Sequence, residues 1–106
     1  FEDVYFSPLG VSALVSLISK IAERNFSGLI NAAGFETISK FEFARLVASA
    51  IGRDRALVSP GSVSSLGGSV PRPNYLALDS TKLTDLLEIE LPSIESMLKI
   101  ELHGVI

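Results

Sequence analysis

The stretch from residue 59 to residue 75 most constrains this chain, because it offers a folded core almost nothing to bury. It is rich in serine, glycine and proline, and Val63 and Leu66 are its only large apolar residues before Val70. Connections of more than ~12–15 residues without structure of their own are uncommon in compact domains and are usually functional or disordered. We therefore expect a flexible loop at about 59–75, with regular structure on either side of it.

The chain as a whole is apolar and carries few charges. Its 106 residues are 47% hydrophobic and 20% charged, with a mean hydropathy of +0.42, whereas a typical domain is about 25% charged. This apolar content excludes intrinsic disorder. The 9 basic residues are outnumbered by 12 acidic ones, which argues against a nucleic-acid partner.

The sequence contains no cysteine, which removes disulfides, thiol nucleophiles and cysteine-rich metal sites. This fits a reducing compartment, and we expect a cytoplasmic protein. The apolar stretch Leu9–Ala22 is too short and too polar to cross a bilayer, and no basic segment precedes it as in a secretory signal. We therefore expect no membrane partner. The chain also opens at Phe1 without a methionine, so we expect a fragment.

The half of the chain before the loop predicts two helices and one strand. Ser7-Pro8 is a good helix start, and apolar residues recur at helical spacing from there to Glu23. The short apolar run Leu29–Ala33 predicts a buried strand. Residues Ser39–Glu42 have the form of a capping box, and Gly52 ends the helix that follows.

The remaining segments are short. We expect a strand at Ala56–Val58 and an edge segment at Leu76–Leu78. Asp79 can cap a short helix, and a last helix runs from Pro92 to Gly104. The sequence thus predicts an α/β lobe of mainly helices with a few short strands.

The chain offers no catalytic constellation. His103 is its single histidine and lies in the last turn of a helix, which favours a solvated side chain. Gly67-Gly68-Ser69 resembles part of a phosphate loop but lacks the lysine and the strand-to-helix context, so a linker explains it better. Acidic residues that could be considered as metal ligands read more simply as caps and a solvated helix face; these are Asp79, Asp85, Glu88 and Glu90. We expect no catalytic, cofactor-binding or metal-ligating residue here.

Arg72 is the residue to weigh for binding. It lies between Pro71 and Pro73, which force an extended backbone and aim the side chain outward. A guanidinium held in this way can recognise a phosphate with two parallel hydrogen bonds. The alternative, a surface arginine in a structural salt bridge, stays open at this point.

A set of short motifs, taken in order, resembles a known family. They are Phe6-Ser7-Pro8 before a helix, the segments Gly28–Gly34 and Ile38–Ala44, the pair Ile51-Gly52, and the segment from Arg72-Pro73 to Leu83. Together they look like the C-terminal third of the extended short-chain dehydrogenases, closest to the dTDP-4-dehydrorhamnose reductases and related sugar-nucleotide enzymes. The resemblance covers the chain from about Phe6 to Leu102.

The resemblance implies an oxidoreductase whose Rossmann lobe holds NAD(P) and whose smaller C-terminal lobe closes over a sugar nucleotide. Residues 1–106 would be that single substrate-binding lobe, with the Rossmann lobe outside it. The family's glycine fingerprint and its Tyr-x-x-x-Lys pair are missing, since Tyr5 is followed four residues later by Leu9 and Tyr75 by Asp79. The lobe alone would bind no dinucleotide, while the parent protein would use NAD(P)H. Arg72 and Asn74 would be substrate-binding residues, with Arg72 near the diphosphate.

Two alternatives remain. The parent could be a non-catalytic regulatory or binding subunit of the same fold, or the chain could be a helical protein-interaction module. The apolar excess has a simple explanation if one face is built to pack on a missing lobe, and the first helix is the expected exposed surface. The isolated chain is then expected to self-associate through that apolar face.

Overall fold

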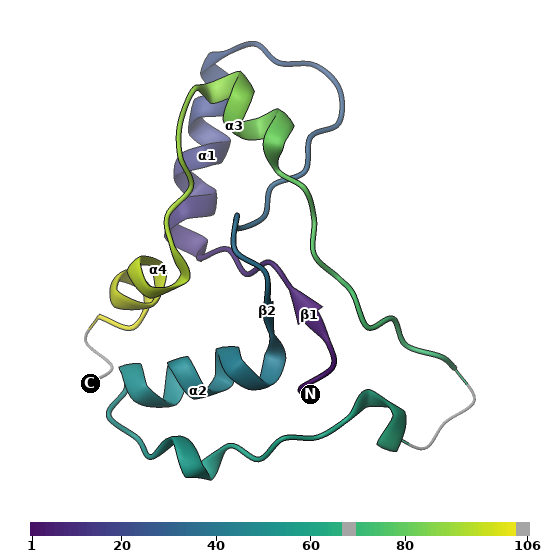
Figure 1. Cartoon of the computed structure of the whole chain (residues 1–106). Coiled ribbons are helices and arrows are strands. Elements are labelled where there is room, and N and C mark those ends of the chain that lie inside the picture. The colour runs from purple at the N-terminus through teal and green to yellow at the C-terminus, as the bar shows by residue number, and fades with distance from the viewer. Residues whose placement is uncertain (67–69, 104–106) are drawn as a thin grey trace.

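The computed structural model describes residues 1–66 and 70–103, and within them it is mostly helical with a two-stranded antiparallel sheet (Figure 1). Its elements are β1 Tyr5–Phe6, α1 Val11–Glu23, β2 Ile38–Ser39, α2 Lys40–Ala50, 3-10 turns at Arg55–Leu57 and Val63–Ser65, α3 Thr81–Leu87 and α4 Ile94–Glu101. The prediction of mainly helices with a few short strands is confirmed. The Rossmann context stays a prediction.

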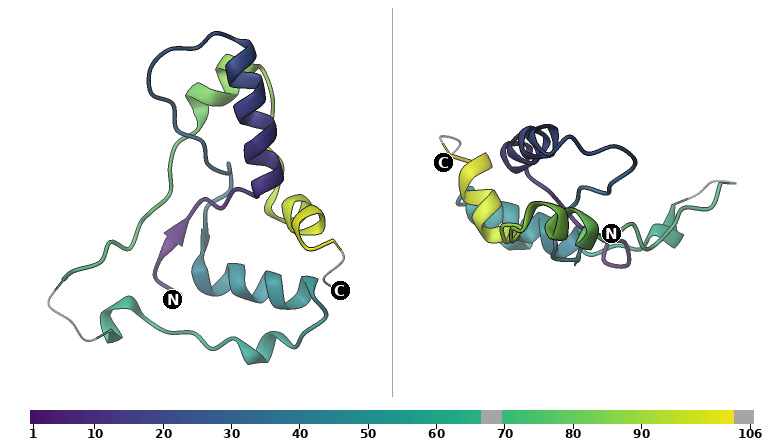
Figure 2. Two further views of the ribbon diagram at one scale, coloured as in Figure 1. Left: turned by 180° about the vertical axis from the view of Figure 1, so that it is seen from behind. Right: turned by 90° about the horizontal axis from the view of Figure 1, so that it is seen from above.

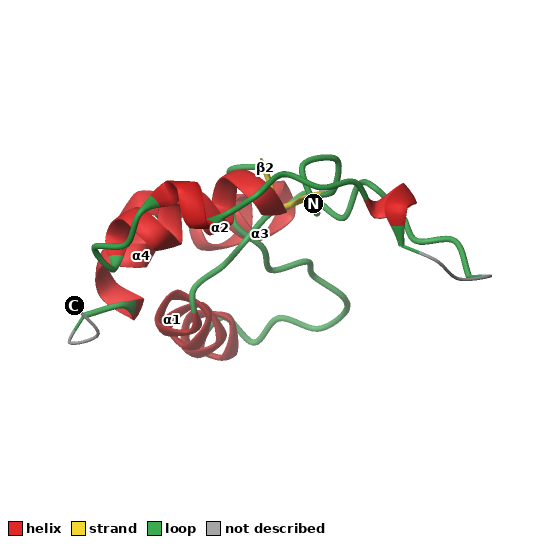
Figure 3. Cartoon of the chain, turned by 90° about the horizontal axis from the view of Figure 1, so that it is seen from below, coloured by secondary structure: helices red, strands yellow, loops and turns green. Residues whose placement is uncertain are grey.

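The lobe is flat and open rather than spherical. It measures 45 × 38 × 17 Å and has a radius of gyration of 16.0 Å, whereas a domain of this size usually has about 13 Å. Helices α1 and α3 lie side by side at one end, and α2 and α4 lie toward the other (Figures 1 and 2). Helix α1 stands to one side of the layer that contains α2, α3 and α4 (Figure 3).

The core is a small leucine cluster where α1 meets α3. Leu17 of α1 packs with Leu83 and Leu87 of α3 and with Leu91 beyond it, and Leu83 is completely buried. Partly buried residues surround this cluster; they are Leu9, Ile21, Ile30, Ala32, Leu86 and Ile89. The core therefore fastens one end of the lobe and leaves its other elements to be joined by hydrogen bonds and smaller contacts.

Helix α1 begins three residues later than Ser7-Pro8 predicted. Its N-cap is Gly10, which has no side chain to cap it, and α4 supplies the missing acceptors instead. The Ser12 amide donates to Glu101 Oε1 at 2.6 Å, and the Gly10 amide donates to Met97 Sδ at 3.2 Å. A Cβ on Gly10 would lie 2.9 Å from Glu101 Oε1. The absence of a side chain at this position therefore leaves room for the Glu101 carboxylate.

The predicted strand at Leu29–Ala33 is wrong. This segment pairs with no strand among the described residues, and Leu29 is exposed. The start of α3 satisfies its backbone groups through side chains: the Ser80 hydroxyl donates to the Ala33 carbonyl and accepts from the Ala33 amide, both at 3.0 Å. Lys82 Nζ donates to the Leu29 carbonyl at 2.8 Å. Side chains here take the place of a neighbouring strand.

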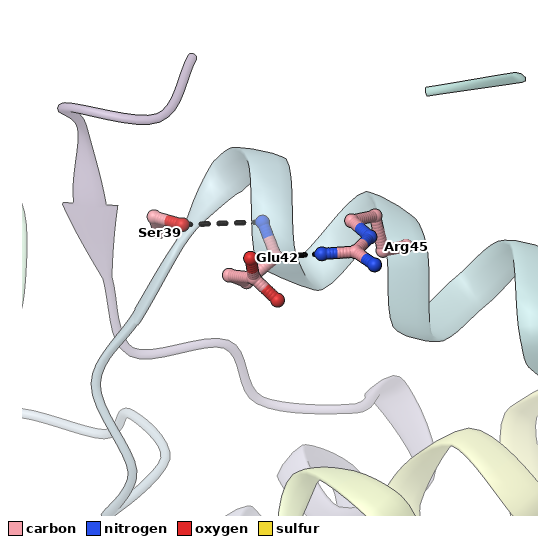
Figure 4. Close-up of polar contacts among 3 residues, drawn as sticks. All are labelled: Ser39, Glu42 and Arg45. Atoms are coloured by element: carbon pink, nitrogen blue, oxygen red, sulfur yellow. Dashed lines mark hydrogen bonds and ion pairs between the residues drawn. The ribbon is translucent and has the colours of Figure 1, made fainter. Parts of the chain in front are cut away.

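The capping signals predicted at the two ends of α2 agree better with the structure. Ser39 Oγ accepts from the Glu42 amide at 3.1 Å, as predicted, but Glu42 Oε1 pairs with Arg45 Nη1 at 3.3 Å instead of returning to Ser39 (Figure 4). The Glu42 carboxylate is engaged instead by the cation three residues further along α2. Gly52 ends α2 with φ +74°, as expected.

Three further boundaries differ slightly from expectation. Ala56–Val58 is not a strand: the Asp54 carboxylate accepts from the Ala56 amide at 2.9 Å and caps a 3-10 turn. Asp79 does accept from the first amide of α3, that of Thr81, although the N-cap position itself is Ser80. Helix α4 starts after Ser93. Gly104, its predicted end, lies outside the described residues.

The leucine cluster should account for much of the stability. We expect Leu83→Ala to lower the free energy of unfolding by about 2–5 kcal/mol, because it removes buried methyl groups and leaves a cavity. Denaturant titration of the purified chain measures this. Leu57→Ala is the matched control, since Leu57 is 73% exposed; equal effects of the two changes would contradict the assigned core.

Candidate functional site

The segment after Arg72 is fixed to β1 by backbone hydrogen bonds. The Tyr5 amide donates to the Asn74 carbonyl at 2.8 Å, and the Leu76 amide donates to the Tyr5 carbonyl at 2.7 Å. Tyr75 thereby forms a parallel bridge with Tyr5. Of the edge segment predicted at Leu76–Leu78, only the Leu76 amide pairs with β1, and the bridge itself is at Tyr75. Arg72 lies only two residues from this anchored position.

Arg72 itself is exposed, in an extended stretch without regular structure. The ion pairs between described residues are Arg45 with Glu42 and Lys99 with Glu95, and Arg72 takes part in neither. Its planar guanidinium presents five N–H donors in a fixed fork, which matches the oxygens of a phosphate. The guanidinium is therefore open to solvent, while the backbone two residues further on is anchored to β1.

Asn74 forms hydrogen bonds within the lobe through both its side chain and its backbone. Its Nδ2 donates to the Asp3 carbonyl at 3.1 Å, while its own carbonyl accepts from Tyr5. The side chain is nevertheless exposed. Its predicted contact with a substrate stays a prediction, and the observed role is to hold the segment against the N-terminal strand.

The region before residue 67 is tied to the same strand, and it is not structureless. Asp3 Oδ2 accepts from the Ser62 hydroxyl at 2.5 Å, and Asp3 Oδ1 accepts from the Val63 amide at 3.0 Å. The Glu2 amide donates to the Gly61 carbonyl at 2.7 Å. The hydrogen bond from Ser62, followed by that from Val63, lowers the pKa of Asp3 below its ordinary value of 3.8.

One hollow that the described residues line lies elsewhere, between α2 and α4. This groove has a volume of about 1010 Å³, with an apolar floor that includes Leu46 and Leu98 and with Lys99 and His103 toward the end of α4. Two smaller hollows of about 300 and 200 Å³ lie beside α1 and before α3. None of these three is lined by Arg72 or Asn74. Sequence patterns could not reveal the α2–α4 groove, because its walls come from separate helices.

His103, the single histidine of the chain, lies just beyond the end of α4. His103 is exposed, and no group of three or more His, Cys, Asp or Glu side chains there could hold a metal ion. Among the same residues, no helix is both long and apolar enough to cross a membrane. The glycine-rich triplet Gly67-Gly68-Ser69 lies outside the described residues.

Comparison with known families gave a match. The family model described as RmlD substrate binding domain matches residues 1–104. A search of curated proteins and a search of solved structures each found no match. The family match extends over both halves of the lobe and includes the Arg72 segment.

The Asp3 contacts give a pH dependence with a defined sign. The folded-state pKa of Asp3 is lowered, so its stabilising contribution is complete above 3.8 and is lost as the pH falls through the folded pKa. We expect carboxyl NMR titration to place the Asp3 midpoint below 3.8, and Ser62→Ala to raise it toward that value. A midpoint at or above 3.8 in the unaltered protein would refute the Asp3–Ser62 hydrogen bond.

Proposed function

Because this chain belongs to the RmlD substrate-binding domain family, the substrate-binding domains of dTDP-4-dehydrorhamnose reductases, we propose that it holds the nucleotide sugar in an NAD(P)-dependent sugar-nucleotide reductase. The family match over residues 1–104 is the observation that carries this proposal. A sugar nucleotide presents a diphosphate, a base and a sugar, so a binding lobe needs at least one cationic fork placed at the surface.

Arg72 is our choice for that fork. Its exposure, its position between two prolines and its closeness to the anchored Asn74–Leu76 backbone favour a guanidinium that is accessible and yet restricted in position. The planar arginine guanidinium can donate two parallel hydrogen bonds to phosphate oxygens, whereas the lysine ammonium group acts as a single point charge. Asn74 would lie at the edge of the same site, with its Nδ2 bound to Asp3.

Hydride transfer is assigned to residues outside this chain. Neither tyrosine is followed by a lysine four residues later, and no glycine fingerprint is present. Residues 1–106 therefore do not fit a dinucleotide, and we derive no reaction step for them. The coding sequence before Phe1 tests this part of the proposal: a glycine-rich βαβ unit and a Tyr-x-x-x-Lys pair should be found there. A fingerprint without the Tyr-x-x-x-Lys pair would favour the non-catalytic subunit instead.

The substrate role of Arg72 has a direct test in the full product of the gene. We expect Arg72→Ala to weaken the affinity for dTDP about tenfold or more, because a hydrogen bond to a charged group contributes about 1.5–3 kcal/mol. Titration calorimetry measures the dissociation constant. Arg53→Ala is the matched control, as Arg53 is exposed and follows α2. Unchanged affinity in Arg72→Ala would remove Arg72 from the site.

A partner surface is proposed on α1. Val11, Val15 and Ile18 are 68%, 60% and 57% exposed, and their spacing of four and three residues places them on one side of the helix. The stripe they form contains no charge that would repel a second copy. We propose that the isolated lobe self-associates through this stripe, as a contiguous apolar face favours.

Sedimentation can test this association. We expect Val15→Glu to shift the isolated chain toward the monomer, because two copies would place carboxylates together in an apolar contact. The same change at Val70, which is 77% exposed and is not part of α1, should leave the sedimentation unchanged. A chain that is monomeric before any substitution would overturn the proposed surface.

A further inference from the structure

Residues 2–5 hold the chain on both sides of Arg72. One arm is Gly61–Val63 and the other is Asn74–Leu76, and each hydrogen-bonds to this short N-terminal segment. We propose that Asp3 is a positioning residue for Arg72, which determines how closely the guanidinium is held for an anionic ligand. The inference rests on the proposed function of Arg72 as the diphosphate contact.

The first arm depends on the Asp3 side chain. Each carboxylate oxygen has its own donor, the Ser62 hydroxyl on Oδ2 and the Val63 amide on Oδ1. Ser62 in turn accepts from the Ser64 amide at 3.2 Å and so caps the 3-10 turn Val63–Ser65. One half-buried carboxylate therefore fixes both the position and the local fold of this arm.

The second arm depends on backbone groups of the same residues. The Asp3 carbonyl accepts from Asn74 Nδ2, and Tyr5 exchanges hydrogen bonds with Asn74 and Leu76. Among the described residues, Asp3 is thus the one that hydrogen-bonds to both arms, through its side chain on one side and its carbonyl on the other. The two arms are separate in sequence, and both are hydrogen-bonded to residues 2–5.

Residues 1–6 are themselves anchored to α2. Val4 is 3% exposed, and its carbonyl accepts from the Lys40 amide at 2.9 Å at the start of α2. The Phe1 carbonyl accepts from the Phe41 amide at 2.9 Å, and Phe6 packs edge-on against Phe43 with ring centroids 5.2 Å apart. Movement of Asp3 would have to disturb α2, so its position is set by the body of the lobe.

Restraint at both arms matters for ligand binding. With only the Asn74–Leu76 arm in place, Arg72 would be held from one side and would sample more positions. Ligand binding would then have to order the Arg72 side chain. The lost conformational entropy lowers the affinity, although no direct contact with the ligand is removed. A carboxylate is well matched to the first arm, because it accepts two charge-assisted hydrogen bonds at once, whereas asparagine has a single acceptor oxygen.

The test is a double-mutant cycle on the full gene product, with dTDP as the probe in titration calorimetry. We expect Asp3→Ala to raise the dissociation constant about threefold to tenfold and Asp3→Asn to raise it less. Asp3→Ala should add nothing when Arg72→Ala is already present, because a positioning residue acts through the residue it positions. Asp85→Ala, at an exposed acid on α3, is the matched control and should bind as the unaltered protein does.

Amide hydrogen exchange provides a readout that does not depend on binding. In Asp3→Ala we expect faster exchange at Val63 and Ser64, with unchanged protection at Tyr5 and Leu76, whose acceptors are backbone carbonyls. If Asp3→Ala prevents folding, Ser62→Ala removes one of the Asp3 bonds without changing the N-terminal strand, and the same cycle is run with it.

The outcomes separate the two proposals. Unchanged affinity in Arg72→Ala overturns the proposed role of Arg72 and the positioning role with it. Weaker binding in Arg72→Ala together with unaltered binding in Asp3→Ala overturns the positioning role alone. Additive losses in the double variant also overturn it, since they would show that Asp3 contributes independently of Arg72.

Discussion

The backbone of residues 1–6 is the interaction on which the rest of this lobe depends. The leucine core joins α1 and α3 at one end, and neither α2 nor the Arg72 segment contributes a residue to that cluster. The N-terminal stretch makes that connection: it pairs with β2, receives two amides from the start of α2 and pairs with Tyr75. Two strand residues on each side are enough, because the stretch is bonded along both of its edges. This explains how a flat lobe with a small core keeps its extended segments in place.

The function that this architecture serves is one of holding a ligand. The chain belongs to a substrate-binding family, and the ligand contact proposed in it is the exposed Arg72, two residues from an anchored backbone. Binding and chemistry would then be divided between parts of one protein. Such a division favours a lobe whose polar side chains mostly hold backbone segments in position. Ser80, Asp3 and Asn74 do this here through hydrogen bonds to backbone groups.

Prediction from sequence succeeded where a residue acts on its near neighbours. Ser39 caps the amide three residues on, Gly52 takes the positive φ that ends α2, and Asp79 reaches the first amide of α3. It failed where the partner is distant. Ser80 replaces a strand partner for Ala33 at a separation of 47 residues, and Glu101 starts α1 from 89 residues away. The candidate site divides in the same way: Arg72 can be proposed from its adjacent prolines and stays a prediction, whereas the Asp3–Ser62 contact joins residues 59 positions apart and gives no signal in the sequence.

The capping of α1 by Glu101 links the first helix to the last described one and has a consequence for the order of folding. Synthesis runs from the N-terminus, so residues 11–23 leave the ribosome well before residue 101 is made. Until then the Ser12 amide lacks its carboxylate acceptor, and Gly10 has no side chain to substitute for it. A short helix without its cap is marginal in water. The first turn of α1 therefore gains its carboxylate acceptor only after translation has passed α4.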